Sequence, residues 1–219
     1  MGTKWTEVLA GDLNAADQRL HVALGDDAGD VVAMINSDPS LVKVMADYVI
    51  TLSLEWRKNQ RIRIIEPGRV MEVNLDATPN LPFNGAKVEF HQGGGWVKVE
   101  KRADGLYIGD KKVTLHLSKK QLNGKTIRGH ELREELSGKP VLNSNILDAL
   151  IEHPEFIPEE WKKDAKGNTI YIFFWGTIFR DAGGNLYVRY LYWFDGGWYW
   201  YYRWLDVDWY GGPAAVCAE

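Results

Sequence analysis

The sequence has a single cysteine, Cys217, among its 219 residues. One cysteine cannot form an internal disulfide, so packing alone must hold the fold, and a reducing compartment such as the cytoplasm is favoured. Cys217 lies close to the end of the chain, where catalytic geometry is rarely maintained. We therefore interpret it as an incidental thiol on a frayed tail rather than as a nucleophile.

Long apolar runs are also missing. The longest one, residues 170–179, has the length of a strand and is well short of the roughly 18 residues that indicate a membrane-spanning helix. Residues 1–10 lack the charged and apolar regions of a signal peptide. We therefore expect no membrane partner and a cytoplasmic location.

The chain has no excess of positive charge. Its 26 Lys and Arg stand against 30 Asp and Glu, which gives a formal charge of −4 and argues against a basic nucleic-acid coat. Segment 171–210 carries three Arg and four Asp, so it does not predict the basic groove that single-stranded nucleic acid needs. A hydrophobic content of 45% excludes an intrinsically disordered chain.

Familiar chemical motifs are absent as well. The phosphate-binding loops G-x-x-x-x-G-K-[ST] and G-x-G-x-x-G after a strand do not occur. No two of the five histidines have the i, i+4 spacing of a helical zinc pair, so we predict no metal site and no cofactor. Residues 91–95 loosely resemble the oxyanion segment of some esterases, but G-x-S-x-G is missing, and a hairpin turn explains them better.

Hydrophobic periodicity predicts an α+β fold in two parts. Residues 1–58 form a helical region, clearest where apolar residues recur every three or four positions after Pro39. Residues 59–219 form a mainly antiparallel β domain. It begins with a central antiparallel β-meander over about 60–117, whose expected strands are 61–64, 70–73, 86–90, 96–101, 105–108 and 112–117.

A helical insert, residues 118–166, separates this meander from a second sheet. This short helical connection holds a helix at 130–136 and another that Asn143 and Ser144 cap before Pro154. A C-terminal aromatic antiparallel sheet follows, with expected strands at 170–179, 186–194 and 198–206. We leave open whether the two sheets join into one layer or a barrel.

Aromatic residues are what the sequence has in excess. It contains 10 Trp and 10 Tyr, and six of these Trp and eight of these Tyr lie within 171–210. Period-two alternation places Trp198, Trp200, Tyr202, Trp204 and Asp206 on one face of the last strand, and Tyr199, Tyr201, Arg203, Leu205 and Val207 on the other. Both faces are aromatic, so this sheet is either a core packed on both sides, which we favour slightly, or a working surface.

If one face is exposed, its side chains are suited to stacking against a ligand. Sugars stack on aromatic rings while polar neighbours bind their hydroxyls, and Tyr, Trp and Arg also anchor protein interfaces. The sequence therefore predicts a binding or interaction protein, with a glycan or a protein as the partner. The candidate ligand-binding residues are Trp193, Trp198, Trp200, Tyr202, Arg203, Trp204, Asp206 and Asp208.

Two other readings involve carboxylates. Asp206 and Asp208 share a face and could hold a cation, although we interpret them as solubilising acids at a strand end. The alternative function is a small bacterial hydrolase acting on a saccharide or an ester. Glycoside hydrolysis needs two carboxylates, and Glu72, Glu89 and Glu100 on the central strands could supply such a pair.

Three segments of the C-terminal part carry a resemblance. HPEFIPEEWK, IYIFFWGTIFRDAGGNLYVRYLYW and GGWYWYYRWLDVDWYGGPAAV are similar to a recurrent aromatic-rich segment in small uncharacterised proteins of candidate-phyla bacteria. The resemblance covers about Leu142 to Ala218, and more weakly Glu72 to Gly138. It implies a bacterial setting and transfers no catalytic residue.

Overall fold

Helices and antiparallel strands are mixed in the protein, as expected for an α+β fold. The computed structural model describes residues 61–217. The helical region expected over residues 1–58 lies outside the described residues.

Five strands of the first half form the expected antiparallel meander. They are β1 (Ile62–Glu66), β2 (Val70–Asn74), β4 (Trp96–Arg102), β5 (Gly105–Ile108) and β6 (Lys111–His116). Alternation sets their faces: Met71 and Val73 are fully buried on β2, whereas Glu72 between them is partly exposed. These bounds agree with the predicted strands to within two residues.

Strand β3 (Lys87–His91) does not belong to this meander, although the sequence placed it there. It pairs with β9 (Thr177–Arg180), where Phe90 lies opposite Ile178. Residues 92–95 are therefore not a hairpin turn between β3 and β4. The backbone N–H groups of Gly94 and Gly95 instead donate to the Asp76 carboxylate at 2.9 and 3.0 Å, which fixes the glycine-rich loop.

The last aromatic strands appear much as predicted, except that one is split in two and another ends early. β10 (Leu186–Phe194) and β11 (Gly197–Trp204) form a long hairpin, and the expected strand over 170–179 is split into β8 (Ile172–Phe173) and β9. The split falls at Gly176, where a Cβ atom would lie only 2.8 Å from the Asn143 nitrogen. β11 stops at Trp204 instead of continuing to Asp206.

A strand that the sequence did not reveal joins the two halves. β13 (Ala214–Cys217) pairs antiparallel with β6 and parallel with β8. The chain near Cys217 is therefore not a frayed tail, because its backbone pairs with Val113. The predicted meander and aromatic sheet thus become one 11-stranded sheet within the described residues, in the order β1-β2-β4-β5-β6-β13-β8-β10-β9-β3, with β11 beside β10. β7 (Ile127–Arg128) and β12 (Asp208–Trp209) form a separate small sheet.

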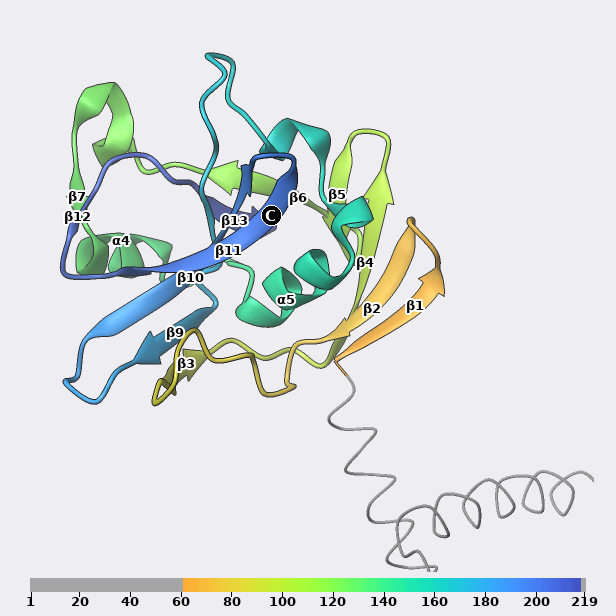
Figure 1. Cartoon of the computed structure of the whole chain (residues 1–219), viewed down its shortest axis with the longest axis horizontal. Coiled ribbons are helices and arrows are strands. Elements are labelled where there is room, and N and C mark those ends of the chain that lie inside the picture. Colours follow the sequence, from red (N-terminus) through yellow and green to blue (C-terminus); the bar gives the residue numbers. More distant parts are fainter. Residues whose placement is uncertain (1–60, 218–219) are drawn as a thin grey trace, which may run out of the picture. The chain divides into compact units, whose positions relative to one another are not determined.

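The helical insert holds α4 (Gly129–Leu136) and α5 (Ser144–Glu152). It also has short 3-10 turns at Pro154–Phe156 and Glu159–Trp161, and a 3-10 segment at Lys119–Gly124 that is kinked at Leu122 and Asn123. Asn143 caps α5 as predicted, and its Oδ1 accepts from the backbone N–H groups of Asn145 and Ile146. Every residue from Ser144 to Leu150 is buried. α5 is therefore the central helix of the fold rather than a peripheral connection, and it contacts β2, β10 and β11 (Figure 1).

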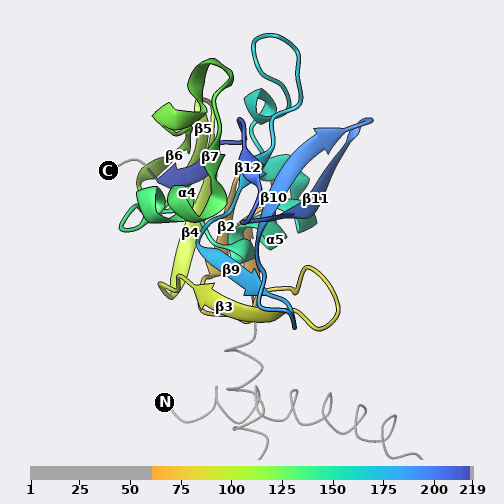
Figure 2. The same ribbon diagram turned by 90° about the vertical axis from the view of Figure 1, so that its left-hand side faces the viewer.

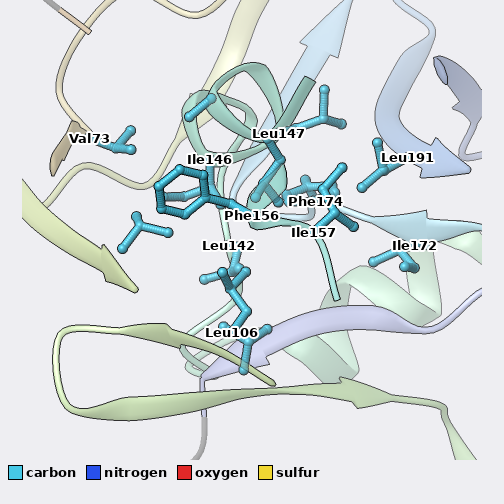
Figure 3. Close-up of a cluster of buried hydrophobic side chains, with 14 of the residues drawn as sticks. Val73, Leu106, Leu142, Ile146, Leu147, Phe156, Ile157, Ile172, Phe174 and Leu191 are labelled. Carbon is cyan, nitrogen blue, oxygen red and sulfur yellow. The ribbon is translucent and has the colours of Figure 1, made fainter. Parts of the chain in front are cut away.

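The main core surrounds α5. Figure 3 shows Ile146 and Leu147 of the helix among side chains from both halves of the sheet, including Val73 and Leu191. Full burial of one such side chain contributes about 1.5–3 kcal/mol. A second cluster packs Leu132 and Leu136 of α4 with Val188 and Trp209. The two clusters together hold the β10–β11 hairpin, which forms one side of the molecule in Figure 2.

Candidate functional site

The β10–β11 hairpin has two different faces. In its register Tyr190 lies opposite Tyr201 and Tyr192 lies opposite Tyr199. The intervening pairs place Trp200 opposite Leu191 and Trp198 opposite Trp193. Because neighbouring pairs point to opposite sides, one face is mainly tyrosine and the other is mainly tryptophan and leucine.

The tyrosine-rich face is the more exposed of the two. We define the tyrosine face as Tyr171, Tyr190, Tyr192, Tyr199 and Tyr201. Tyr171, just before β8, is 46% exposed, and Tyr199 and Tyr201 are 47% and 53% exposed. The rings of the face contact one another with centroids 5.6–6.3 Å apart, within the range of favourable aromatic pairs.

A pocket of about 270 Å³ adjoins the tyrosine face. Tyr171, Tyr190 and Tyr210 line it together with Phe173, Trp209 and Arg203. Gly212 also lines the pocket, and a Cβ at this position would lie 2.6 Å from the Phe173 ring. A glycine here therefore lets the chain pass close to the Phe173 ring as it returns toward β13.

Arg203 supplies the positive charge of this pocket. Its Nη2 donates to the Asp208 carbonyl oxygen at 2.8 Å, and its guanidinium carbon lies 5.2 and 5.7 Å from the ring centres of Trp209 and Tyr210. The buried Nε has no hydrogen-bond acceptor among the described residues. These contacts hold the guanidinium beside the aromatic rings, where it can meet a polar ligand.

The Tyr190 hydroxyl, between the pocket and the rest of the tyrosine face, stays neutral near pH 7. Burial raises the pKa of the Tyr190 hydroxyl above its ordinary value, and the neighbouring Tyr192 and Tyr171 act in the same direction. A neutral phenol both donates and accepts hydrogen bonds. The face therefore combines stacking surface with hydroxyl groups of both hydrogen-bonding kinds.

Most of the residues predicted from the sequence lie on the opposite, inner face. Trp198 and Trp200 are half-buried against the α5 core, and the guanidinium carbon of Arg189 lies 4.0 Å from the Trp200 ring centre. Trp193 packs on Trp198 at 5.3 Å. Trp198 and Trp200 therefore belong largely to the packing between the hairpin and α5, whereas Trp193 also carries Lys162 Nζ 4.0 Å from its ring centre.

The two remaining predicted aromatics lie farther along the same inner face. Tyr202 packs against Phe83, with ring centroids 5.0 Å apart, and against Tyr187 at 5.6 Å. Trp204, at the end of β11, is 40% exposed. Of all the predicted ligand-binding residues, Arg203 alone lines the pocket beside the tyrosine face.

The two predicted aspartates follow β11 and contact different basic side chains. The Asp206 carboxylate is 2.9 Å from Nε2 of His130 on α4, and the Asp208 carboxylate is 3.5 Å from Arg128. Residues 61–217 contain no group of three or more His, Cys, Asp and Glu side chains placed to hold a metal ion. The structure therefore places both aspartates in contacts with basic side chains.

The sequence does not single out the tyrosine face as a site, although the period-two pattern of β11 predicts which side chains share a face. The useful signal is the difference between the two faces. Trp198 and Trp200 share their face with Leu191, whereas Tyr199 and Tyr201 share theirs with Tyr190 and Tyr192. A tyrosine keeps a hydroxyl that needs a polar partner, so the tyrosine-rich face is the better choice for the exposed side.

The carboxylates considered for hydrolysis lie at two places in the sheet. Glu89 lies on β3, apart from the face that Glu72 and Glu100 share on β2 and β4. Hydrogen bonds from Arg102 and Lys98 lower the pKa of Glu100, and Arg180 lowers the pKa of Glu89 in the same way. A general acid needs a raised pKa, so neither group is suited to that role near neutral pH.

Residues 91–95 are likewise engaged in structural contacts. His91 Nδ1 is 2.8 Å from the Thr177 hydroxyl and Nε2 is 2.6 Å from the Leu75 carbonyl oxygen. Because that carbonyl can only accept, Nε2 carries the proton and the Thr177 hydroxyl donates to Nδ1. The histidine thus links β3, β9 and the loop after β2.

No known protein family, curated protein or solved structure matches the chain. The resemblance to a bacterial family stays a prediction. Among the described residues, no helix has both the length and the apolar character needed to cross a membrane.

Proposed function

We propose that the protein is a binding module whose tyrosine face takes an extended glycan. The observation that carries this proposal is the row of contacting tyrosines on the exposed side of the hairpin, next to a pocket that holds Arg203. Sugar rings stack their C–H faces on the phenol rings, and one sugar unit enters the pocket. Arg203 and the tyrosine hydroxyls bind the sugar hydroxyl groups.

The geometry supports binding better than catalysis. The pocket lining contains a single charged side chain, Arg203, and no carboxylate. Glycoside and ester hydrolysis both require an acid, base or nucleophile held close to the scissile bond. The hydrolase alternative therefore has no support at the tyrosine face and its pocket.

A glycan panel followed by calorimetry tests this proposal. Tyr199→Ala removes a ring from the face and Tyr210→Ala removes a ring from the pocket, where Tyr210 is 71% exposed. We expect each change to weaken binding about tenfold, roughly 1.4 kcal/mol. Tyr107→Ala on β5, away from the hairpin, is the matched control and should leave the affinity unchanged.

Two results would count against the proposal. No response across a broad panel of neutral and acidic oligosaccharides would remove the glycan as ligand. Equal loss of affinity in all three variants would show that the tyrosine face is not the contact surface. A protein that binds the wild type and not Tyr199→Ala would assign the face to a protein partner instead.

The setting of this function is a bacterial cytoplasm. The single cysteine supports a compartment where disulfides are not needed, and the resemblance of the C-terminal segment supports the bacterial origin.

A further inference from the structure

A second cavity, at α4, lies beyond Trp175, whose ring centroid is 5.0 Å from that of Trp209 in the pocket beside the tyrosine face. It has a volume of about 340 Å³, within the size range of small-molecule sites. Its apolar lining comes from Phe90 of β3, Leu136 of α4, Val141 and Trp175. Leu136 and Trp175 are almost fully buried, whereas Phe90 is 44% exposed. The cavity therefore has a fixed apolar floor and one aromatic side chain available at its rim.

Basic side chains line the same cavity. Arg133 and Lys139 line it with His130, and Glu134 is the one carboxylate in the lining. His130 is already paired with Asp206. Arg133 and Lys139 have no carboxylate oxygen within ion-pair distance among residues 61–217. Arg133 does act on Glu89 from farther away and helps to lower the pKa of that carboxyl, whose direct partner is Arg180.

A wider hollow continues from this cavity. It has a volume of about 540 Å³ and shares Gln92, Gly138 and Lys139 with the first, and it adds Lys111 of β6. Lys111 also lacks an ion-pair partner within the described part of the chain. The combined groove thus gathers three unpaired cations, although the chain as a whole carries a formal charge of −4. A local excess of positive charge in an acidic protein favours an anionic ligand.

We propose that this α4 groove binds a small aromatic anion, a ring that carries a phosphate or a carboxylate group. The ring occupies the 340 Å³ cavity and contacts Phe90. The anionic group meets Arg133 and Lys139, where a guanidinium and an ammonium can both donate charge-assisted hydrogen bonds. The site is distinct from the tyrosine face and does not depend on its function.

Four probe molecules separate the contributions of ring and charge. Phenyl phosphate and benzoate carry both, benzyl alcohol carries the ring alone, and inorganic phosphate carries the charge alone. With ligand-observed NMR and calorimetry on the full chain, we expect phenyl phosphate or benzoate to bind about tenfold more tightly than either single-feature probe. The stronger of these two anions identifies the anionic group that the groove prefers.

A matched pair of double variants tests the location. Arg133→Gln with Lys139→Gln removes two charges from the groove, and Lys119→Gln with Lys125→Gln removes two charges outside its lining. We expect the first pair to weaken binding of the aromatic anion at least about tenfold and the second to change it less than about twofold. All four side chains are exposed or half-buried, so both variants should keep the wild-type urea midpoint.

Three outcomes would overturn the proposal. Binding of benzyl alcohol as tight as that of phenyl phosphate would mean that the groove recognises only apolar surface. Equal losses in the two double variants would mean that only net charge matters. Absence of binding by both aromatic anions at millimolar concentration would mean that the groove holds no such ligand.

Discussion

At the scale of single residues, the ion pair between Arg189 and Asp148 is the most deeply buried one among the described residues. Arg189 of β10 is fully buried, its Nη2 lies 2.8 Å from the Asp148 carboxylate, and its Nη1 donates to the Asn80 carbonyl at 3.1 Å. Burial lowers the pKa of the guanidinium, and the Asp148 charge opposes that shift. Arg189 thus depends on Asp148 for its one ion pair among the described residues, whereas the Asp148 carboxylate also lies 3.7 Å from Arg61 and accepts from the Asn80 N–H at 3.1 Å.

We predict that Asp148→Ala lowers the free energy of unfolding by about 3–5 kcal/mol, because it leaves the Arg189 charge buried and unpaired. Urea titration followed by tryptophan fluorescence measures this loss. The double change Asp148→Leu with Arg189→Met removes both charges and should be clearly less harmful. It still leaves the Asn80 N–H without its acceptor, at a cost of about 1–3 kcal/mol. A double variant less stable than the single one would contradict this account.

At the scale of secondary-structure elements, Asn143 joins the central helix to the surrounding loops. Its Oδ1 caps α5, while its Nδ2 donates to the carbonyl oxygens of Leu75 and Gln92 at 3.1 and 2.9 Å. The side chain is almost fully buried, at 1% exposure. One amide thus provides both the acceptor of a helix cap and a donor to two loops.

We predict that Asn143→Asp is at least as destabilising as Asn143→Ala, although Asp is generally as good a cap as Asn. The carboxylate would keep the cap but face two carbonyl oxygens in a buried position. His91 Nε2, 3.4 Å from the nitrogen that is replaced, already donates to the Leu75 carbonyl oxygen at 2.6 Å. The favourable helix-dipole term, about 0.3–1 kcal/mol, is smaller than the cost of burying the unpaired charge. Thermal unfolding of the two variants checks the order. Wild-type stability in Asn143→Asp would show that the two donated bonds contribute nothing.

Local patterns in the sequence were sufficient to find most elements. The period-two alternation located β4, β5 and β10, and the Asn143 cap located the start of α5. Pairing between distant strands could not be read in this way. β3 pairs with β9, about ninety residues later in the chain, and β13 inserts between β6 and β8. Such pairings bring together segments that lie far apart in the chain, and a shared core stabilises them. A pattern taken from a short sequence window contains no information about such distant partners.

The sequence predicted the candidate site less well than the fold, also because distant segments form it. Alternation separated the tyrosine side chains from the tryptophans on β11, but it did not say which set faces α5. That choice follows from the core: Leu191 belongs to the same buried cluster as Leu147 and Leu150 of α5, and Trp200, opposite Leu191 in the hairpin, packs against that cluster. The α4 groove is harder still to predict, because Phe90, Lys139 and Trp175 come together only through the pairing of β3 with β9.

At the scale of the whole molecule, several carboxylates stabilise the fold by staying ionised. Arg180 lowers the pKa of Glu89, and Arg102 with Lys98 lowers that of Glu100. In the loop between β9 and β10, Asp181 has a lowered pKa because it accepts from the Asn185 side chain and backbone and from the Tyr187 hydroxyl. The Asp164 pKa is lowered chiefly by Asn168. The first two shifts come from charges and the last two from neutral donors.

These shifts predict how stability depends on pH. A carboxyl whose folded-state pKa lies below its ordinary value, 4.5 for Glu and 3.8 for Asp, stabilises the fold above that value. The contribution is lost as the pH falls from there through the folded-state pKa, since the unfolded chain then binds more protons. We therefore expect the melting temperature to fall steeply below about pH 4.5.

Salt should weaken the pH-dependent stabilisation that comes from Glu89 and Glu100, whose partners are charged. It should leave the stabilisation that comes from Asp181, whose partners are neutral. In Asp181→Asn the fall should be shallower at both low and high salt, and a slope identical to that of the wild type would rule out a contribution from this loop.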